Sequence, residues 1–191
     1  MFNEKAASTD TVSAGLVARN GADSGARAGG VFYVQCFDKD GTLKWSTSEH
    51  NLVVNQGLQD MNTNYFKGSA YTASFFLGLV TGPGSGTTFA AADTLASKAW
   101  TEFTDYSGSR KSVTFGTATT ADPSVISNSA SPSSFTITGA GGVVAGAFLC
   151  TVSSGTSGIL FSESDFQSPG DRTVVAGDTL NVTYTFSLDA A

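Results

Sequence analysis

Apolar and polar residues alternate most regularly in the last part of the chain, from Asp178 to Leu188. Five apolar residues stand there at every second position, namely Leu180, Val182, Tyr184, Phe186 and Leu188. Successive side chains of a β-strand point to opposite faces, so this pattern predicts a strand at 178–188. One face of that strand should be buried along its whole length, and the strand should lie centrally in its sheet.

Shorter runs of apolar and β-branched residues recur through the rest of the chain, separated by Gly, Ser, Thr and Ala. Such runs predict short strands joined by turns. The strands are expected at 31–37, 42–47, 51–55, 71–80, 98–106, 112–119, 134–138, 143–152, 158–162 and 172–176. Segments 81–97 and 120–133 are expected to be long loops. This pattern predicts an all-β protein, a two-sheet sandwich of the jelly-roll or a similar type.

One segment, 56–66, has a helical pattern instead. Its apolar residues fall at positions i, i+3 and i+7, namely Leu58, Met61 and Tyr65. Asn55 is the expected N-cap, and Gly68 is expected to end the helix. A single short helix cannot cover a sheet, so it is expected to plug one end of the β body.

Residues 1–30 form a separate region because they lack strand alternation. Their larger apolar side chains are too sparse to form a core: Phe2, Val12, Leu16 and Val17. We therefore expect an extended N-terminal arm at 1–30 and a β-sandwich body at 31–191, with the four apolar arm residues binding a partner. The arm is neutral because three acidic residues balance three basic ones: Glu4, Asp10 and Asp23 against Lys5, Arg19 and Arg27.

The composition narrows the classes of partner. The 191 residues carry a net charge of −6, and only 14% of them are charged, below the roughly 25% of typical soluble domains. An acidic chain without Lys or Arg clusters disfavours nucleic acid and anionic membranes as partners. The first residues lack the basic and apolar regions of a signal peptide, and no apolar run has the about 20 residues that a membrane span needs. Synthesis in a cytoplasm is therefore expected.

The two cysteines, Cys36 and Cys150, each lie inside an apolar, strand-like run. A small secreted scaffold would carry a denser framework of cysteines. Buried free thiols are therefore the expectation, and a disulfide between neighbouring strands stays open as the alternative.

No motif predicts a metal, a cofactor or a catalytic triad. His50 is the one histidine, and no G-x-S-x-G elbow accompanies it, so a packed or hydrogen-bonded histidine is expected. Segment 38–42 is similar to the start of an EF-hand loop, but Leu43 stands where that loop needs glycine, and a hairpin turn is expected instead. One histidine and two distant cysteines lack the spacing of a zinc site.

Two pairs of carboxylates leave one enzymatic alternative open. Glu102 with Asp105, or Glu163 with Asp165, could flank a glycosidic bond in the manner of a glycoside hydrolase. Glu163 and Asp165 are expected at a strand end, where such charges are usually solvated. The expectation is a protein without enzymatic activity.

Five segments share an order and spacing with one protein family. They are Trp45 with H-N-L-V-V-N-Q-G-L at 50–58, F-F-L-G-L at 75–79, W-T-E-F at 100–103, G-A-F-L at 146–149, and R-T-V-V-A-G-D-T-L at 172–180. Together they resemble a family of tailed-bacteriophage virion structural proteins. The resemblance covers about residues 42–188 and does not include the arm.

This resemblance implies a structural part of a phage particle and supplies no catalytic residues. A rigid β body with an extended arm suits a capsid cement or decoration protein, because an arm across neighbouring subunits binds at high effective concentration once the body has docked. The acidic body suits the outer surface of the head better than its DNA-lined interior. The expected partners are the major capsid protein and further copies of the chain, in a homo-oligomer.

A tail-associated host-recognition or carbohydrate-binding module is the alternative function. A sugar site needs exposed aromatic side chains, and Tyr71, Trp100, Phe103 and Tyr106 could provide them. Aromatic residues on alternating strands more often belong to a core. Copy number separates the two functions, since a cement protein is present in hundreds of copies and a tail protein in a few dozen at most.

Overall fold

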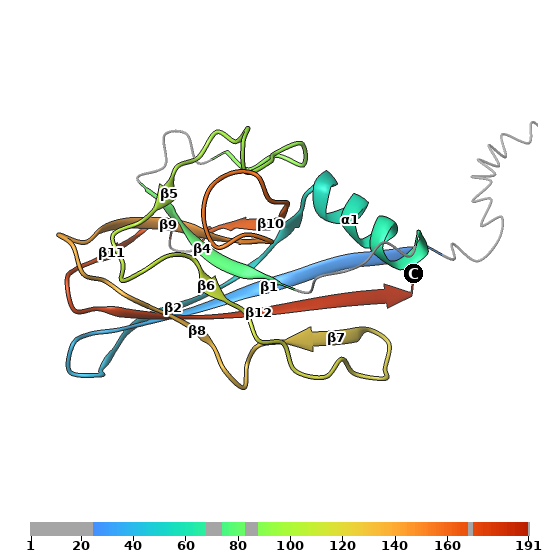
Figure 1. Ribbon diagram of the computed structural model, residues 1–191. Coiled ribbons are helices and arrows are strands. Elements are labelled where there is room, and N and C mark those ends of the chain that lie inside the picture. Colours follow the sequence, from blue (N-terminus) through green and yellow to red (C-terminus); the bar gives the residue numbers. More distant parts are fainter. Residues whose placement is uncertain (1–24, 68–73, 83–87, 168–169, 191) are drawn as a thin grey trace, which may run out of the picture.

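The computed structural model describes residues 25–67, 74–82, 88–167 and 170–190. The predicted partner-binding residues of the arm lie outside these residues: Phe2, Val12, Leu16 and Val17. Within the described parts, two antiparallel sheets pack into a sandwich, with one helix at one end (Figure 1). The all-β, two-sheet prediction is confirmed, and the jelly-roll connectivity stays a prediction.

The first sheet is built around the C-terminal strand. Its five described strands are β1 (Ala26–Phe37), β2 (Leu43–His50), β7 (Ser124–Ser127), β8 (Ser133–Thr136) and β12 (Thr179–Ala190). β12 pairs along its full length with β1, from Thr179 opposite Phe37 to Ala190 opposite Ala26. Its other edge pairs with β8 and then β7. The prediction of a central final strand is therefore confirmed.

The second sheet is assembled on β9. Its seven described strands are β3 (Leu52–Val53), β4 (Phe76–Thr81), β5 (Glu102–Phe103), β6 (Lys111–Ser112), β9 (Gly142–Cys150), β10 (Leu160–Asp165) and β11 (Arg172–Val174). β9 lies between β4 and β10 and also pairs with β11. Its residues from Val144 to Cys150 are all buried, as expected of a strand covered on both faces.

Burial along β12 changes from one end of the strand to the other. Leu180, Val182 and Tyr184 are fully buried between the sheets. Phe186 is only partly buried, and Leu188 is 43% exposed. The prediction of a face buried along the whole strand was therefore wrong for its last two apolar positions, Phe186 and Leu188. The apolar pattern continues there, but the residues around Leu188 border an open groove.

The helix α1 (Asn55–Phe66) confirms the predicted helical segment but differs at its start. Val54 is the N-cap, without a side-chain capping bond, so the prediction of an Asn55 cap was wrong. Gly57 is the buried residue of the helix, because a Cβ there would lie 2.3 Å from the carbonyl oxygen of Phe161 on β10. This contact holds α1 against the second sheet at the end where β1 begins and β12 finishes (Figure 1).

Several strand boundaries differ from the prediction. β1 begins at Ala26, inside the predicted arm, and β7 lies within the predicted loop 120–133. The expected strand at 98–106 is reduced to β5. Trp100 and Tyr106 are buried but lie outside this strand, and Tyr106 forms only an isolated bridge with Ile137. The spacing of apolar residues indicates which side chains are buried. It does not indicate which backbone groups pair with a neighbouring strand.

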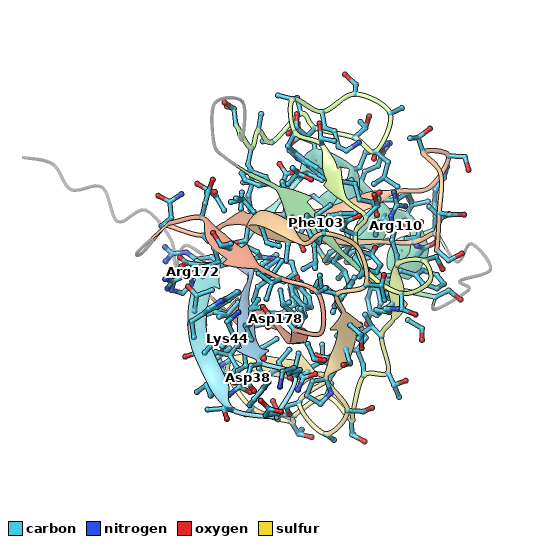
Figure 2. All side chains as sticks on the ribbon, turned by 90° about the vertical axis from the view of Figure 1, so that its left-hand side faces the viewer. Asp38, Lys44, Phe103, Arg110, Arg172 and Asp178 are labelled. Atoms are coloured by element: carbon cyan, nitrogen blue, oxygen red, sulfur yellow. The ribbon has the colours of Figure 1, made fainter. Side chains whose placement is uncertain are left out.

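The end of the sandwich opposite α1 is closed by polar contacts. The carboxylate of Asp178, only 2% exposed, accepts a hydrogen bond from Lys44 Nζ at 2.5 Å and one from the backbone N–H of Val175 at 2.9 Å. Figure 2 looks onto this end and shows Lys44 beside Asp178. The ion pair ties the turn before β12 to β2.

Cys36 and Cys150 are buried and both free, which confirms the predicted thiols. They belong to different sheets, on β1 and β9. Burial and the nearby carboxylate of Asp178 raise the pKa of the Cys36 thiol to about 11. The thiol is therefore protonated and unreactive at neutral pH. In the described residues, no helix has the length and apolar character to span a membrane.

Candidate functional site

A large apolar groove opens at the α1 end of the sandwich, with a volume of about 1180 Å³. Its walls are α1, the first residues of β1, the end of β12 and segment 113–116. We call it the α1 groove. α1 is held against β10 at Gly57. The helix does not fill the space between the sheets at this end, and that space is the groove.

The α1 groove collects exposed apolar side chains. Seven large apolar side chains are exposed among the described residues, and four of them line this groove: Leu58, Tyr65, Phe66 and Leu188. Tyr65 and Phe66 are 84% and 79% exposed, with ring centroids 5.0 Å apart. Single exposed apolar residues are ordinary, but a contiguous group with a polar rim marks an interaction surface.

The floor of the groove is aromatic. Phe161 packs edge-on against Phe75 and Phe186, with centroid distances of 5.5 and 5.6 Å, and Phe75 packs against Phe115 at 5.9 Å. Edge-to-face packing fixes the orientation of each ring. The floor is therefore a preformed surface of ring edges and faces, suited to aliphatic or aromatic side chains.

Polar residues of α1 form one side of the rim. Asn64 Nδ2 donates a hydrogen bond to Asp60 Oδ1 at 2.7 Å, so the carboxylate at the rim already has a partner on its own helix. Asp60 is the only charged residue among the described residues that line the groove. The groove thus favours an apolar, nearly uncharged ligand over a highly charged one.

The sequence held a signal for this groove that the helical pattern obscured. Leu58, Met61 and Tyr65 share the helical spacing that predicts a helix plugging one end of the body. Only Met61 packs against the core, while Leu58 is 40% exposed and Tyr65 more so. The adjacent aromatic pair Tyr65 and Phe66 was the available signal, because two neighbouring residues on a helix cannot both face the same narrow core.

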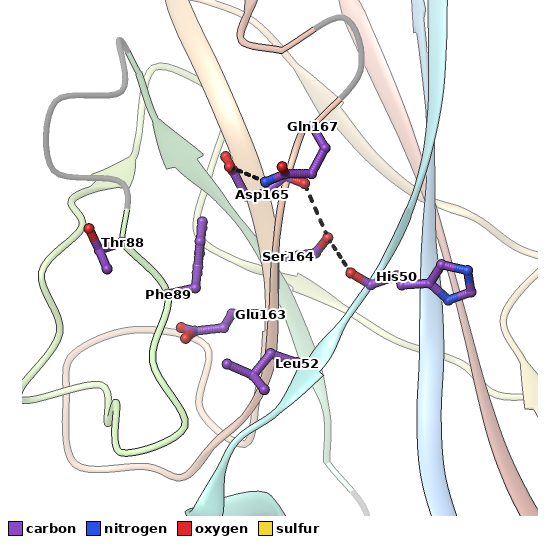
Figure 3. A pocket seen from close by; sticks show the side chains of 8 residues that line it. All are labelled: His50, Leu52, Thr88, Phe89, Glu163, Ser164, Asp165 and Gln167. Atoms are coloured by element: carbon purple, nitrogen blue, oxygen red, sulfur yellow. Dashed lines mark hydrogen bonds between the residues drawn. The ribbon is translucent and has the colours of Figure 1, made fainter.

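A second, smaller cleft of about 390 Å³ brings together three titratable residues named from the sequence. His50, Glu163 and Asp165 line it, together with Leu52, Thr88, Phe89, Ser164 and Gln167 (Figure 3). We call it the Glu163 cleft. It lies where β10 passes the end of β2.

Glu163 is fully buried, which contradicts the expectation of a solvated carboxylate. Trp100 Nε1 donates to its Oε2 at 2.8 Å, and the backbone N–H of Ala90 donates to its Oε1 at 3.2 Å. Burial and the nearby Asp93 raise the pKa of Glu163 to about 8, against an ordinary value of 4.5. At neutral pH this side chain is mostly protonated and anchors segment 90–100 to β10.

The other two titratable residues of the cleft do not form a reactive arrangement with Glu163. Ser164 Oγ donates to the carbonyl oxygen of His50 at 3.0 Å, while the imidazole of His50 points away from the cleft (Figure 3). Asp165 Oδ2 accepts from Gln167 Nε2 at 2.5 Å, and burial raises the pKa of Asp165. A nucleophilic serine requires a base that accepts its proton, and the imidazole is not placed to do so.

Glu102, one acid of the second predicted carboxylate pair, is held in an ion pair. Glu102 accepts two hydrogen bonds from Arg110, from Nε at 2.9 Å and from Nη2 at 2.7 Å. Arg110 is buried and also donates to the carbonyl oxygen of Val152 at 3.2 Å. This forked ion pair joins three segments of the second sheet and leaves the Glu102 carboxylate paired.

The aromatic residues expected for a sugar site belong to the core. Trp100, Phe103 and Tyr106 are each at most 6% exposed, and Tyr71 lies outside the described residues. Trp100 packs against Phe148 with ring centroids 4.8 Å apart. The three described side chains therefore cannot stack on a sugar from solvent.

The predicted turn at 38–42 is confirmed. Asp38 Oδ1 accepts hydrogen bonds from the backbone N–H groups of Asp40 and Thr42 at 2.9 and 2.8 Å. Gly41 has the positive φ of 81° that this turn requires. Across the described ranges, no group of three or more His, Cys, Asp or Glu side chains could hold a metal ion.

Comparisons with protein-family models, with curated proteins and with solved structures find no match to this chain.

Proposed function

We propose that this protein is a non-enzymatic structural component of a tailed-phage virion, a cement or decoration protein on the outer surface of the head. The β body and the N-terminal arm attach it to the major capsid protein and to further copies of itself. The virion assignment rests on the ordered sequence segments between Trp45 and Leu180. The mode of action rests on the α1 groove.

The observation that carries the attachment role is the clustering of exposed apolar side chains at one end of the body. A catalytic pocket needs a few converging polar groups, whereas the α1 groove offers an aromatic floor and a single, already paired carboxylate at its rim. Such a surface binds another polypeptide through buried apolar area. The groove lies beside the start of β1, so docking at this end also brings the arm to the partner.

The titratable groups support a structural role as well. Glu163 and Glu102, the two acids with the strongest claim to catalysis, each hold two segments of the body together. Glu163 is fully buried, and both carboxylate oxygens of Glu102 accept hydrogen bonds from Arg110, so neither acid is placed to protonate a leaving group.

Purified particles test the proposed function directly. We expect the protein to be a stoichiometric component of the virion, present in hundreds of copies by gel densitometry or quantitative mass spectrometry. Purified protein should also rebind particles from which it has been stripped. A few dozen copies would instead indicate the tail, and absence from the particle would refute a virion role.

A turnover screen tests the non-enzymatic part. Polysaccharides and peptidoglycan incubated with the protein should show no cleavage products by mass spectrometry. Cleavage that disappears in Glu163→Gln or Glu102→Gln, while Asp40→Asn retains it, would contradict the proposal and assign catalysis to the altered carboxylate.

A further inference from the structure

The α1 groove is large and apolar, and it holds exposed aromatic side chains. Its volume of about 1180 Å³ exceeds the roughly 300–1,000 Å³ of typical small-molecule pockets. Two of its aromatic side chains, Tyr65 and Phe66, are more than three-quarters exposed. We propose that the groove binds residues 1–24 of a second copy of this chain, an inference that rests on the attachment role proposed above.

The position of the arm supports this occupant. Ala26 and Ala28 line the groove themselves, and β1 runs from there into the sandwich. The chain therefore enters the body at the mouth of the groove, and residues 1–24 come directly before that point. Two copies whose groove ends face one another would each present an arm to the groove of the other, in a reciprocal contact.

The length of the arm favours a neighbouring copy over the same chain. Residues 1–24 can span about 80 Å when extended, about twice the roughly 40 Å of a 12-residue strand such as β1. Val17 precedes Ala26 by nine positions, or up to about 30 Å of extended chain. Occupying its own groove would require the chain to turn back on itself within those nine positions, which a groove on a facing copy does not require.

The chemistry of the arm matches that of the groove. Three apolar residues, Val12, Leu16 and Val17, stand within six positions, and Phe2 adds an aromatic side chain. The charges of residues 1–24 nearly cancel, with Glu4, Asp10 and Asp23 against Lys5 and Arg19. A nearly neutral segment with branched aliphatic side chains suits an aromatic floor with one paired carboxylate at its rim.

Self-association of the full-length chain tests the exchange. Analytical ultracentrifugation over a range of concentrations should show an oligomer for the unaltered chain. The arm variant Leu16→Asp/Val17→Asp and the groove variant Phe66→Asp should each weaken self-association at least tenfold. Val175→Asp is the matched control, because Val175 is 49% exposed at the opposite end of the body, and it should associate like the unaltered chain.

Mixing the two variants distinguishes exchange between copies from binding within one chain. The arm variant keeps an intact groove and the groove variant keeps an intact arm, so the mixture should regain association that neither variant shows alone. No regain on mixing, or an unaltered chain that is monomeric at every concentration, would overturn the proposal. If Phe66→Asp does not fold by circular dichroism, a labelled peptide of residues 1–24 replaces it, and this peptide should bind the folded arm variant.

Particle binding by the same proteins separates this inference from the proposed function. A monomeric chain that still rebinds stripped particles, and loses rebinding in Phe66→Asp, would mean that the groove takes a capsid protein; the exchange would be refuted and the virion role retained. A chain that exchanges arms but is absent from particles would refute the virion role and retain the exchange.

Discussion

Asn51 donates its side-chain N–H to the hydroxyl oxygen of Tyr184 across 2.8 Å, in the space between the two sheets. Ser162 on β10 donates to the same oxygen at 3.1 Å. Gly30 makes room for this contact, because a Cβ there would lie 3.1 Å from the hydroxyl and 2.5 Å from the carbonyl oxygen of Thr185. The hydroxyl of Tyr184 thus joins the first sheet to β10 of the second sheet and to the link between β2 and β3.

Removal of that hydroxyl should destabilise the body. Tyr184→Phe keeps the ring but leaves two buried donors without their acceptor, at a cost of about 1–3 kcal/mol. Tyr33→Phe is the control, since Tyr33 is 38% exposed and the change should stay within about 0.5 kcal/mol. Urea unfolding followed by fluorescence measures both. Equal effects of the two changes would show that the Tyr184 bonds contribute no net stability.

The loss of unfolding free energy on alanine substitution should decrease along β12, as the burial of its side chains decreases. Leu180 and Leu188 share a face of the same strand, but Leu180 is fully buried and Leu188 is 43% exposed. Leu180→Ala should cost about 2–5 kcal/mol, as for other buried leucines, and Leu188→Ala less than about 1 kcal/mol in dilute protein. Denaturant unfolding below the concentration of self-association is the measurement. A large loss at Leu188 would mean that the groove is closed in the free protein.

The docking of α1 should depend on the missing side chain at position 57. Alanine normally favours a helix over glycine by about 1 kcal/mol. Gly57→Ala should nevertheless destabilise the protein by about 1–3 kcal/mol, because the new Cβ would lie 2.3 Å from the carbonyl oxygen of Phe161. Gln59→Ala, at an exposed position of the same helix, should be nearly neutral. A stabilising Gly57→Ala would show that α1 is not held against β10.

Stability should fall as the pH rises through the titration of Glu163. Its pKa is raised from 4.5 to about 8, so the folded state retains a proton that the unfolded state loses above about pH 4.5. The free energy of unfolding should therefore decrease between about pH 5 and pH 8. Glu163→Gln should flatten this dependence, although not completely, because Asp165 has a raised pKa and contributes a slope of the same sign.

The measurement that tests Glu163 is how steeply the free energy of unfolding changes with pH, and not its value at one pH. A glutamine amide cannot accept both hydrogen bonds from Trp100 and Ala90, so Glu163→Gln is expected to lose some stability at every pH. Asp40→Asn, at an exposed turn position, should retain the slope of the unaltered protein. An unchanged slope in Glu163→Gln would show that Glu163 ionises normally in the folded state.

Period-two alternation was sufficient to predict the all-β class and the central β12, and the residues Asp38–Gly41 were sufficient to predict the hairpin turn. These features depend on local chemistry: side chains that alternate between faces, an aspartate that accepts backbone N–H groups, and a glycine that takes positive φ. The helical spacing in 56–66 predicted α1 for the same reason. The sequence also allowed the free, buried state of both cysteines to be predicted from their apolar surroundings.

Tertiary structure decided everything that depends on which segments meet. Glu163 was expected in solvent because charges at a strand end are usually solvated, yet Trp100 and Ala90, remote in sequence, contact it, and burial raises its pKa. Leu188 continues a perfect alternation but is left exposed, since burial requires a covering element as well as an apolar face. The α1 groove arises in the same way, because the space that α1 leaves open is a property of the assembled sandwich and of no single stretch of its sequence.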